Sequence, residues 1–205
     1  MPQRPPDFPL ARRGAVSDAL RRRGARTFAE AARLVRDLPY GRPRDPGDAL
    51  AVLREGRGTC SPKHALLARA AREQGARGVR LVVGLYRMTG ANTPGVGAVL
   101  LRHRLRSLPE AHAYLKVGRR RIDFTRRGRG SASPFAALLA EREATPAWVE
   151  GRKAAWHRRA LRRWARERGL DPARVWEARE ECIAALSSRE PGGARRAVGA
   201  ARRVR

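Results

Sequence analysis

Residues 56–75 read GRGTCSPKHALLARAAREQG, and they decide the fold because they predict a helix that begins next to a cysteine. Pro62 falls in the expected first turn, the leucines and alanines after it share one apolar face, and Gly75 is a typical stop signal. We therefore predict a helix over residues 61–74 with Cys60 at its N-terminal edge. Unpaired backbone N–H groups and the positive end of the helix dipole favour an anion there, and the thiolate is the reactive form of cysteine.

The two cysteines of the chain have different surroundings. The ordinary alternative for either is a small buried thiol without reactivity. The N–H groups beside Cys60 are also suited to stabilise an oxyanion, and Gly58 would let the backbone approach a substrate closely. Cys182 lies within a predicted helix with no breaker before it, so we interpret it as structural. Two cysteines cannot form a disulfide framework, and a reducing compartment would keep both as thiols.

A histidine and an aspartate follow on two predicted strands, residues 111–117 and 120–125. Between the strands, Gly118-Arg119 is a plausible two-residue hairpin turn, which fixes the register. In that register His112 and Asp123 are diagonal neighbours on one face, about 7–8 Å apart at the backbone, whereas a three-residue loop would put them on opposite faces. An aspartate bound to one ring nitrogen leaves the other nitrogen free to face a thiol.

Each of these two residues also has an ordinary interpretation, as a solvent-exposed strand histidine and as a surface charge near a turn. Taken together with Cys60, they give a helix-start cysteine, then a strand histidine, then a strand aspartate. This order resembles the transglutaminase-like superfamily. The resemblance covers roughly residues 50–126 and rests on three blocks of sequence: Gly58-Thr59-Cys60-Ser61-Pro62-Lys63 with Leu66-Leu67, Glu110-Ala111-His112-Ala113-Tyr114, and Arg121-Ile122-Asp123-Phe124-Thr125.

The resemblance implies an α+β fold with a papain-like core, in which the cysteine-bearing helix packs on an antiparallel sheet, with flanking helices and a helical C-terminal part. By the same resemblance, Cys60 would form a thioester, His112 would move the proton and Asp123 would orient the histidine. Water as acceptor gives hydrolysis of an amide bond in a peptide or protein, and an amine gives acyl transfer. Many bacterial relatives of this kind are peptidases or amidases.

Two other functions remain open. An arylamine acetyltransferase-like protein uses the same three residue types, but it would need a coenzyme A site, for which the sequence offers no motif. The other is a catalytically inactive transglutaminase-like binding protein whose basic surface engages nucleic acid or other polyanions. We expect no cofactor and no metal, because no C-x-x-C or H-x-x-x-H cluster occurs, and no acidic loop suggests calcium.

The formal net charge is +27, and of the 46 basic residues 43 are arginine. Asparagine occurs once and isoleucine twice, while alanine, arginine, glycine and proline are abundant. A G/C-rich genome would produce this bias without selection for a basic surface. The functional alternative is weak nonspecific binding of polyanions, which a charge of this size permits. No nucleic-acid-binding motif accompanies the arginines.

We divide the chain into a flexible lead-in (1–14), a transglutaminase-like core (15–130), a helical C-terminal extension (131–188) and a disordered basic tail (189–205). The N-terminus lacks the apolar segment of a secretory signal, and the longest apolar run is too short to span a bilayer. We therefore expect a cytoplasmic protein without membrane contact.

The remaining elements follow from caps, breakers and periodicity. In the N-terminal half we predict a helix over residues 15–23, a second that starts at a capping box formed by Thr27 and Glu30 and ends near residue 40, and a short third that starts just after residue 48. Three more helices are expected over residues 134–142, 146–168 and 172–187. Between these groups we expect a strand at 79–86 and a loop at 89–97. His64 shares a helix face with Cys60, so we assign it to the core or to the surroundings of the site. His103 and His157 lie among arginines, and we expect both at the surface.

Overall fold

The computed structural model describes residues 5–45, 47–126 and 134–188. Within these ranges the chain is α+β, with helices around a four-stranded antiparallel sheet in the order β3-β2-β1-β4. The strands are β1 (Val79–Met88), β2 (Leu108–Val117), β3 (Arg120–Ile122) and β4 (Leu138–Glu143). The helices are α1 (Ala15–Arg22), α2 (Phe28–Asp37), α3 (Ala51–Glu55), α4 (Cys60–Glu73), α5 (Gly97–Arg102), α6 (Pro146–Gly151), α7 (Lys153–Arg166) and α8 (Pro172–Ser188). The predicted basic tail lies outside the described residues.

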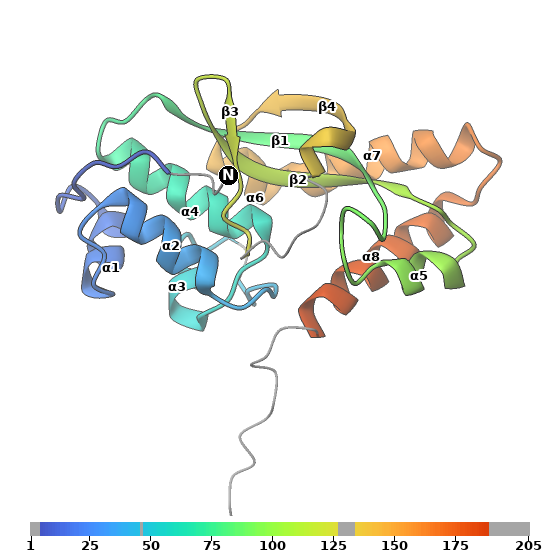
Figure 1. Ribbon diagram of the computed structural model, residues 1–205, viewed down its shortest axis with the longest axis horizontal. Coiled ribbons are helices and arrows are strands. Elements are labelled where there is room, and N and C mark those ends of the chain that lie inside the picture. The colour runs from blue at the N-terminus through green and yellow to red at the C-terminus, as the bar shows by residue number, and fades with distance from the viewer. Residues whose placement is uncertain (1–4, 46, 127–133, 189–205) are drawn as a thin grey trace, which may run out of the picture.

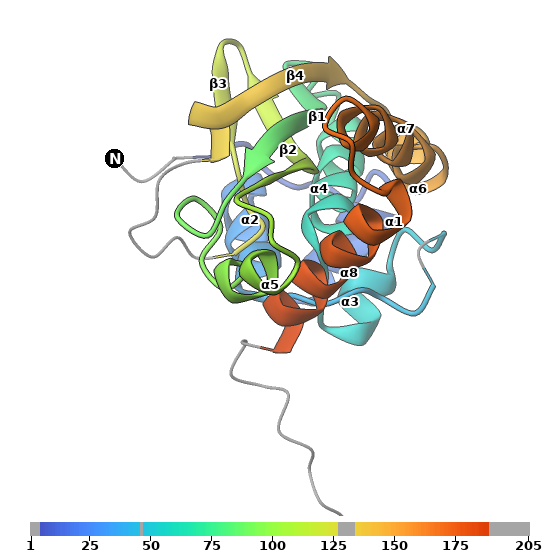
Figure 2. The same ribbon diagram turned by 90° about the vertical axis from the view of Figure 1, so that its right-hand side faces the viewer.

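The sheet lies across the top of the molecule in Figure 1, with α1 to α4 below one end and α5 and α8 below the other. Figure 2 shows α4 beneath the sheet, and α4 contacts both β1 and β2. One hydrophobic cluster joins α1, α2 and α4 to β1 and β2. A second joins α5, α7 and α8 to the far end of β1. Cys60, at the N-terminal end of α4, belongs to the first cluster.

The local signals at α2 and α4 are confirmed. Thr27 and Glu30 form the predicted capping box, each satisfying a backbone N–H near the start of α2. Helix α4 starts at Cys60 and ends at Glu73, and Gly75 follows with a φ of 73°, in the left-handed region that glycine adopts readily. The cysteine is therefore the first residue of a long helix, as the sequence predicts.

The two-residue hairpin is also confirmed. Val117 pairs with Arg120 across the turn, and Gly118 takes a positive φ of 56°. Strand β3 ends at Ile122 rather than at the predicted residue 125. The reason is local: the Asp123 carboxylate accepts a hydrogen bond from the Thr125 N–H at 2.8 Å, and this turn of the backbone competes with strand pairing.

The C-terminal part differs from the prediction in two places. Residues 134–142 are not a helix: a short 3-10 helix (Pro134–Ala137) leads into β4, which pairs with β1. Without β4, the outer edge of β1 would present unpaired backbone groups, and this pairing outweighs the local preference for helix. The helix expected over 146–168 is divided at Arg152 into α6 and α7. The extension after residue 131 is therefore only partly helical.

Two other segments also depart from expectation. From Phe8 onward the predicted lead-in is packed: Leu10 is fully buried, and the ring of Phe8 stacks on Phe28 with centroids 4.8 Å apart. The predicted loop at 89–97 is confirmed as far as Val96, but helix α5, which the sequence analysis did not predict, follows it, and its Val99 and Leu100 join the second cluster.

A buried lysine ties the site-bearing segments together. Lys63 is fully buried on α4, and its Nζ donates to the carbonyls of Leu38 at 2.5 Å and Thr125 at 2.7 Å. A third contact, to the carbonyl of Arg36, measures 3.2 Å. The ammonium thus satisfies carbonyls at the end of α2 and in the segment that carries Asp123, and it holds both against α4.

Replacing this lysine should cost more stability than any ordinary lysine-to-methionine change. Lys63→Met leaves several buried carbonyls without a donor, so we expect the free energy of unfolding to fall by about 3 kcal/mol or more in urea denaturation. Lys116→Met is the matched control, because Lys116 is partly exposed and binds the Glu141 carboxylate, which Arg121 also binds. Equal losses in the two variants would contradict the role assigned to Lys63.

Candidate active site

The three predicted residues lie together although they come from separate elements. Cys60 is the first residue of α4, His112 lies within β2, and Asp123 lies just after β3. His112 Nε2 is 2.8 Å from Asp123 Oδ2. His112 also interacts electrostatically with Cys60, because its imidazolium lowers the pKa of the thiol and the thiolate raises the pKa of the imidazole. The structure therefore brings cysteine, histidine and aspartate together in one site.

The end of β3 makes room for the cysteine. β3 pairs with β2 only over Leu115–Val117, so the neighbouring edge of β2 has no strand beside it. Helix α4 packs on β2, and the backbone N–H of Ala113 in this strand contributes to lowering the pKa of the Cys60 thiol. The same strand therefore supplies both the imidazole and a backbone group that favours the thiolate.

The aspartate is held on both of its oxygens. Oδ2 faces His112, while Oδ1 accepts from the Thr125 N–H at 2.8 Å and from its hydroxyl at 2.5 Å. Burial raises the pKa of the Asp123 carboxyl, but the charge and hydrogen bond of His112 outweigh burial and hold it well below its ordinary value. The carboxylate stays ionised and keeps the ring of His112 in one orientation.

His64 links the cysteine helix to the aspartate segment, in agreement with its assignment to the surroundings of the site. Its Nδ1 is 2.8 Å from the Cys60 carbonyl, and its Nε2 accepts the Phe124 N–H at 2.8 Å. A backbone N–H can only donate, so the proton of the neutral ring lies on Nδ1. Burial lowers the pKa of His64 to about 4, which keeps it neutral.

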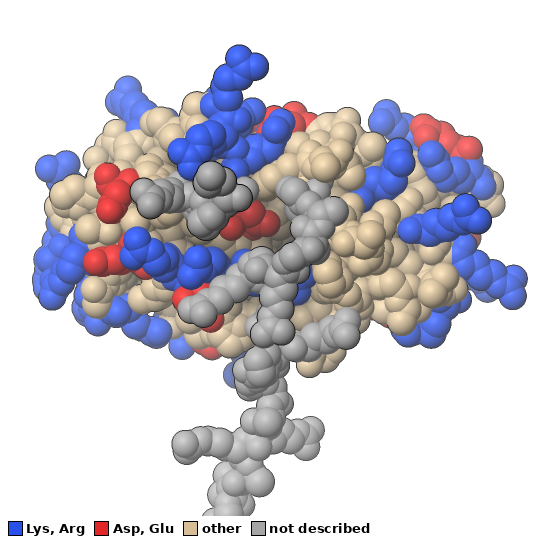
Figure 3. Space-filling model, viewed as in Figure 1, with Lys and Arg blue, Asp and Glu red and all other residues tan. Residues whose placement is uncertain are grey.

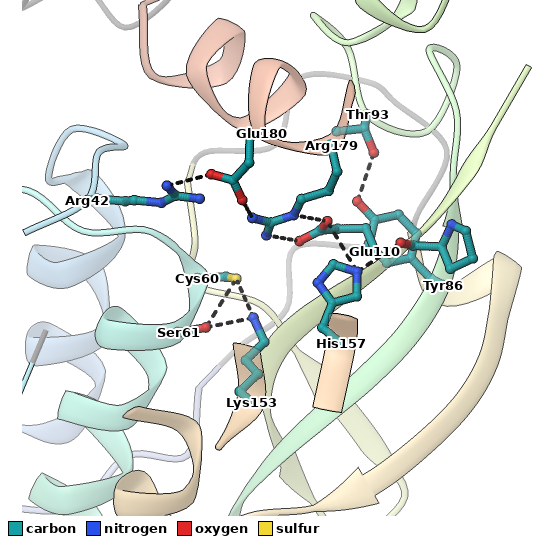
Figure 4. A network of polar contacts seen from close by, with 11 residues as sticks. Arg42, Cys60, Ser61, Tyr86, Thr93, Glu110, Lys153, His157, Arg179 and Glu180 are labelled. Atoms are coloured by element: carbon teal, nitrogen blue, oxygen red, sulfur yellow. Dashed lines mark hydrogen bonds and ion pairs between the residues drawn. The ribbon is translucent and has the colours of Figure 1, made fainter. Parts of the chain in front are cut away.

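A lysine that the motif reasoning did not single out lies beside the cysteine. Lys153, the first residue of α7, has its Nζ 2.8 Å from Ser61 Oγ and 3.9 Å from Cys60 Sγ, as Figure 4 shows. Only 8% of this lysine is exposed. The one signal in the sequence is its residue type, because the chain has 43 arginines and very few lysines.

A second buried ionic network flanks the cysteine (Figure 4). Arg179 of α8 donates two hydrogen bonds to the Glu110 carboxylate, at 2.8 Å and 2.6 Å, and both side chains are almost fully buried. Arg179 also binds Glu180, which pairs with Arg42 at 2.8 Å. This network fixes α8 to β2 at the residue two positions before His112.

The surface prediction for His157 is wrong. His157 is 2% exposed, and its Nε2 donates to the Pro109 carbonyl at 2.9 Å, because α7 packs its inner face on β2. His103 is partly exposed and lies 3.0 Å from Glu181. Cys182 is fully buried, and burial raises its pKa to about 11, as expected for an unreactive thiol.

The electrostatics of the site favour an ion pair between thiolate and imidazolium. Burial raises the pKa of the Cys60 thiol, but the cations Lys153 and His112 outweigh burial and lower it to about 6. Burial lowers the pKa of His112, but Asp123 and the Cys60 thiolate outweigh burial and raise it to about 10. Between these limits the sulfur is negative and the ring positive, which is the reactive state of such a pair.

No protein-family model, curated protein or solved structure matches this chain. Among residues 5–45, 47–126 and 134–188, no group of three or more histidine, cysteine or acidic side chains is placed to hold a metal ion. In the same ranges no helix has both the length and the apolar character required to cross a membrane.

Cys60 should titrate as an activated thiol. In a Cys182→Ala background, we expect iodoacetamide to alkylate Cys60 with a midpoint near the pKa of about 6, compared with about 8.5 for an ordinary thiol. His112→Ala should raise the midpoint, because it removes a cation that stabilises the thiolate. Mass spectrometry of the labelled peptide gives the rate at each pH, and Cys60→Ala is the unlabelled control. A midpoint near 8.5 in both proteins would contradict the ion pair.

Proposed function

We propose that this chain is a cysteine-dependent enzyme of the transglutaminase-like kind, which hydrolyses amide bonds of a peptide or protein or transfers the acyl group to an amine. The observation that carries the proposal is the chain of contacts from Cys60 through His112 to Asp123. A thiolate at a helix start, an imidazolium beside it and a fixed carboxylate behind are the parts that nucleophilic acyl transfer requires.

The arrangement of the elements supports a papain-like core for this proposal. Helix α4 packs on β1 and β2 of an antiparallel sheet and carries the nucleophile at its first residue. The base comes from β2, on which the helix packs, and the orienting carboxylate comes from the residue just after β3. This is the order along the chain that the family resemblance implies.

Acylation begins with attack of the Cys60 thiolate on the amide carbonyl. The new S–C bond pushes the C=O electron pair onto oxygen, and the backbone N–H groups near the start of α4 are placed to stabilise the oxyanion. Collapse of this intermediate breaks the C–N bond, and the His112 imidazolium gives its proton to the departing amine. The products are a thioester on Cys60 and a neutral imidazole.

Deacylation reverses these roles. Neutral His112 takes a proton from water or from an acceptor amine, whose oxygen or nitrogen attacks the thioester carbonyl. The S–C bond breaks and the sulfur leaves as the thiolate, which regenerates the ion pair. Asp123 binds the same ring nitrogen throughout, so the ring does not rotate between the two halves of the reaction.

A trapped acyl group would establish the nucleophile. Incubation of the protein with p-nitrophenyl acetate should release a burst of p-nitrophenolate and add one acetyl group to Cys60, seen by intact-mass and peptide mass spectrometry. Hydroxylamine should remove the group, because thioesters react with it readily. Cys60→Ala should abolish the burst, and Cys182→Ala should leave it unchanged.

Added primary amine then separates hydrolysis from transfer. A transferase should give the acetylated amine in place of acetate, while a hydrolase should give acetate at the same rate. If Cys60 stays unmodified with this ester and with a set of peptide amides, the enzyme proposal is wrong.

One observation favours the second candidate, a binding protein for nucleic acid or another polyanion. The outer face of α7 is a row of exposed arginines, while its inner face is buried. We call this row the α7 arginine stripe, and it consists of Arg158, Arg159, Arg162, Arg163 and Arg166. Figure 3 shows basic side chains at the end of the molecule where α7 lies, and also over the rest of this face. Trp164 and Trp176, each with an arginine over its ring, lie alongside.

The salt dependence of duplex binding tests this candidate. If the stripe binds phosphates, glutamine at Arg159, Arg162 and Arg166 should weaken binding to a DNA duplex and reduce the slope of log K against log salt by about 0.9 for each phosphate that is no longer neutralised. Fluorescence anisotropy over a series of salt concentrations gives the slope. A control with the same charge change, glutamine at Arg12, Arg13 and Arg22, should have a smaller effect. Equal effects would show that net charge alone drives the binding.

A further inference from the structure

The ammonium group of Lys153 is held in place beside the nucleophile. Its side chain is 8% exposed, and Nζ lies 2.8 Å from Ser61 Oγ and 3.9 Å from Cys60 Sγ. Ser61 Oγ is itself 3.8 Å from Sγ, so the three polar atoms form a small triangle. The lysine comes from α7 and the other two residues from α4. Packing of both helices on β2 therefore sets the distance between cation and sulfur.

A buried ammonium needs a negative partner to offset the cost of leaving water. In the part of the chain that the structure describes, no carboxylate forms an ion pair with Lys153. The nearby carboxylate of Glu110 is bound on both oxygens by Arg179. The atom next to Lys153 that can carry a negative charge is the Cys60 sulfur. The positive charge of Lys153 is therefore balanced when the Cys60 sulfur is a thiolate.

We propose that Lys153 is a catalytic residue of the site, which stabilises the Cys60 thiolate independently of His112 and then neutralises the oxyanion formed when that thiolate attacks a carbonyl. This inference rests on the proposed acyl-transfer function. When the S–C bond forms, the negative charge moves from sulfur to the neighbouring carbonyl oxygen. A fixed cation beside the sulfur attracts the charge in both positions, and it keeps its own protons throughout.

His112 and Lys153 have different roles, which explains why the site contains two cations beside one sulfur. His112 must release its proton to the departing amine and take one from the acceptor, so its charge changes during each cycle. Lys153 donates to Ser61 and contacts the sulfur without taking part in proton transfer. The thiolate therefore has one cation whose charge alternates and one whose charge is constant.

Several other groups act on the same sulfur and must be considered in any pH profile. His112 of β2, Tyr40 before α3 and Tyr86 of β1 interact electrostatically with Cys60. The other titratable groups of this region are Glu110 of β2, His64 of α4, Asp123 after β3, His157 of α7 and Arg179 of α8. Glu110 and Arg179 form an ion pair with each other, so their charges offset one another. His64 and His157 stay neutral because burial lowers the pKa of each. His112 and Lys153 thus remain the cations that face the sulfur.

The test compares Lys153→Met with Arg159→Met in a Cys182→Ala background. Arg159 is an exposed residue of the same helix, so the control removes the same charge from the surface. We expect Lys153→Met to raise the midpoint of Cys60 alkylation by about one pH unit or more, which is a tenfold loss of thiolate below the midpoint. Lys153→Arg keeps the charge and should avoid most of this shift. The double variant with His112→Ala should have a higher midpoint than either single variant.

Circular dichroism and urea denaturation show whether each variant is folded. If Lys153→Met does not fold, Lys153→Gln keeps a hydrogen bond to Ser61 without the charge and gives the same comparison. A midpoint in the folded variant equal to that of the Arg159→Met control would overturn the proposal.

The acylation rate with p-nitrophenyl acetate tests the second part. At a pH above the Cys60 midpoint of every variant, Lys153→Met should still acylate at least about tenfold more slowly, because the oxyanion has lost its cation. Equal rates at that pH would overturn the role in stabilising the oxyanion.

The two proposals fail in different ways. If Lys153→Met shifts the midpoint of Cys60 alkylation but no acyl-enzyme forms in any variant, Lys153 is still the partner of the thiolate, and the proposed acyl-transfer function is wrong. An acyl-enzyme that forms equally well with and without Lys153 would keep the enzyme and reject this inference.

Discussion

The contact on which the rest of the structure depends is the buried ammonium of Lys63. It lies one turn after Cys60 and donates to carbonyls of the segment after α2 and of the segment after β3. Without it, these carbonyls would lose a buried donor, and the segment that carries Asp123 would lose one of its polar links to α4, the other being His64. Gly58 is required by the same lysine, because a Cβ at this position would lie 2.8 Å from Lys63 Cγ. The glycine therefore makes room for the lysine side chain, a reason that the sequence analysis did not include.

The charges of the site balance once the thiol is ionised. Cys60 and Asp123 supply two negative charges, and His112 and Lys153 supply two positive ones, all in a region that is largely shielded from water. Beside them, Glu110 and Arg179 form a separate neutral pair. Burial of single charges is costly, but a balanced set with direct hydrogen bonds offsets much of that cost. The lowered pKa of the cysteine and the raised pKa of the histidine are two results of this one balance.

The sequence predicts those features that depend on neighbouring residues. The capping box at Thr27, the start of α4 at Cys60 and the hairpin at Gly118 all follow from local rules, and together they are enough to bring His112 and Asp123 onto one face. Features that depend on distant residues were not predictable in this way. Strand β4 forms because β1 has a free edge, His157 is buried because α7 packs on β2, and Lys153 reaches the sulfur only through that same packing.

The arginine-rich composition gives one further clue to the interior. A mutational bias that favours arginine can replace lysine wherever either residue will do, as on a solvated helix face. The three lysines that remain all bind specific groups: Lys63 binds converging carbonyls, Lys116 binds Glu141, and Lys153 lies between Ser61 and Cys60. A compact ammonium fits such enclosed positions, whereas a planar guanidinium needs a wider, forked partner. The abundant arginines therefore account for the net charge and its effect on association, while two of the rare lysines, Lys63 and Lys153, mark buried positions that require one small cation.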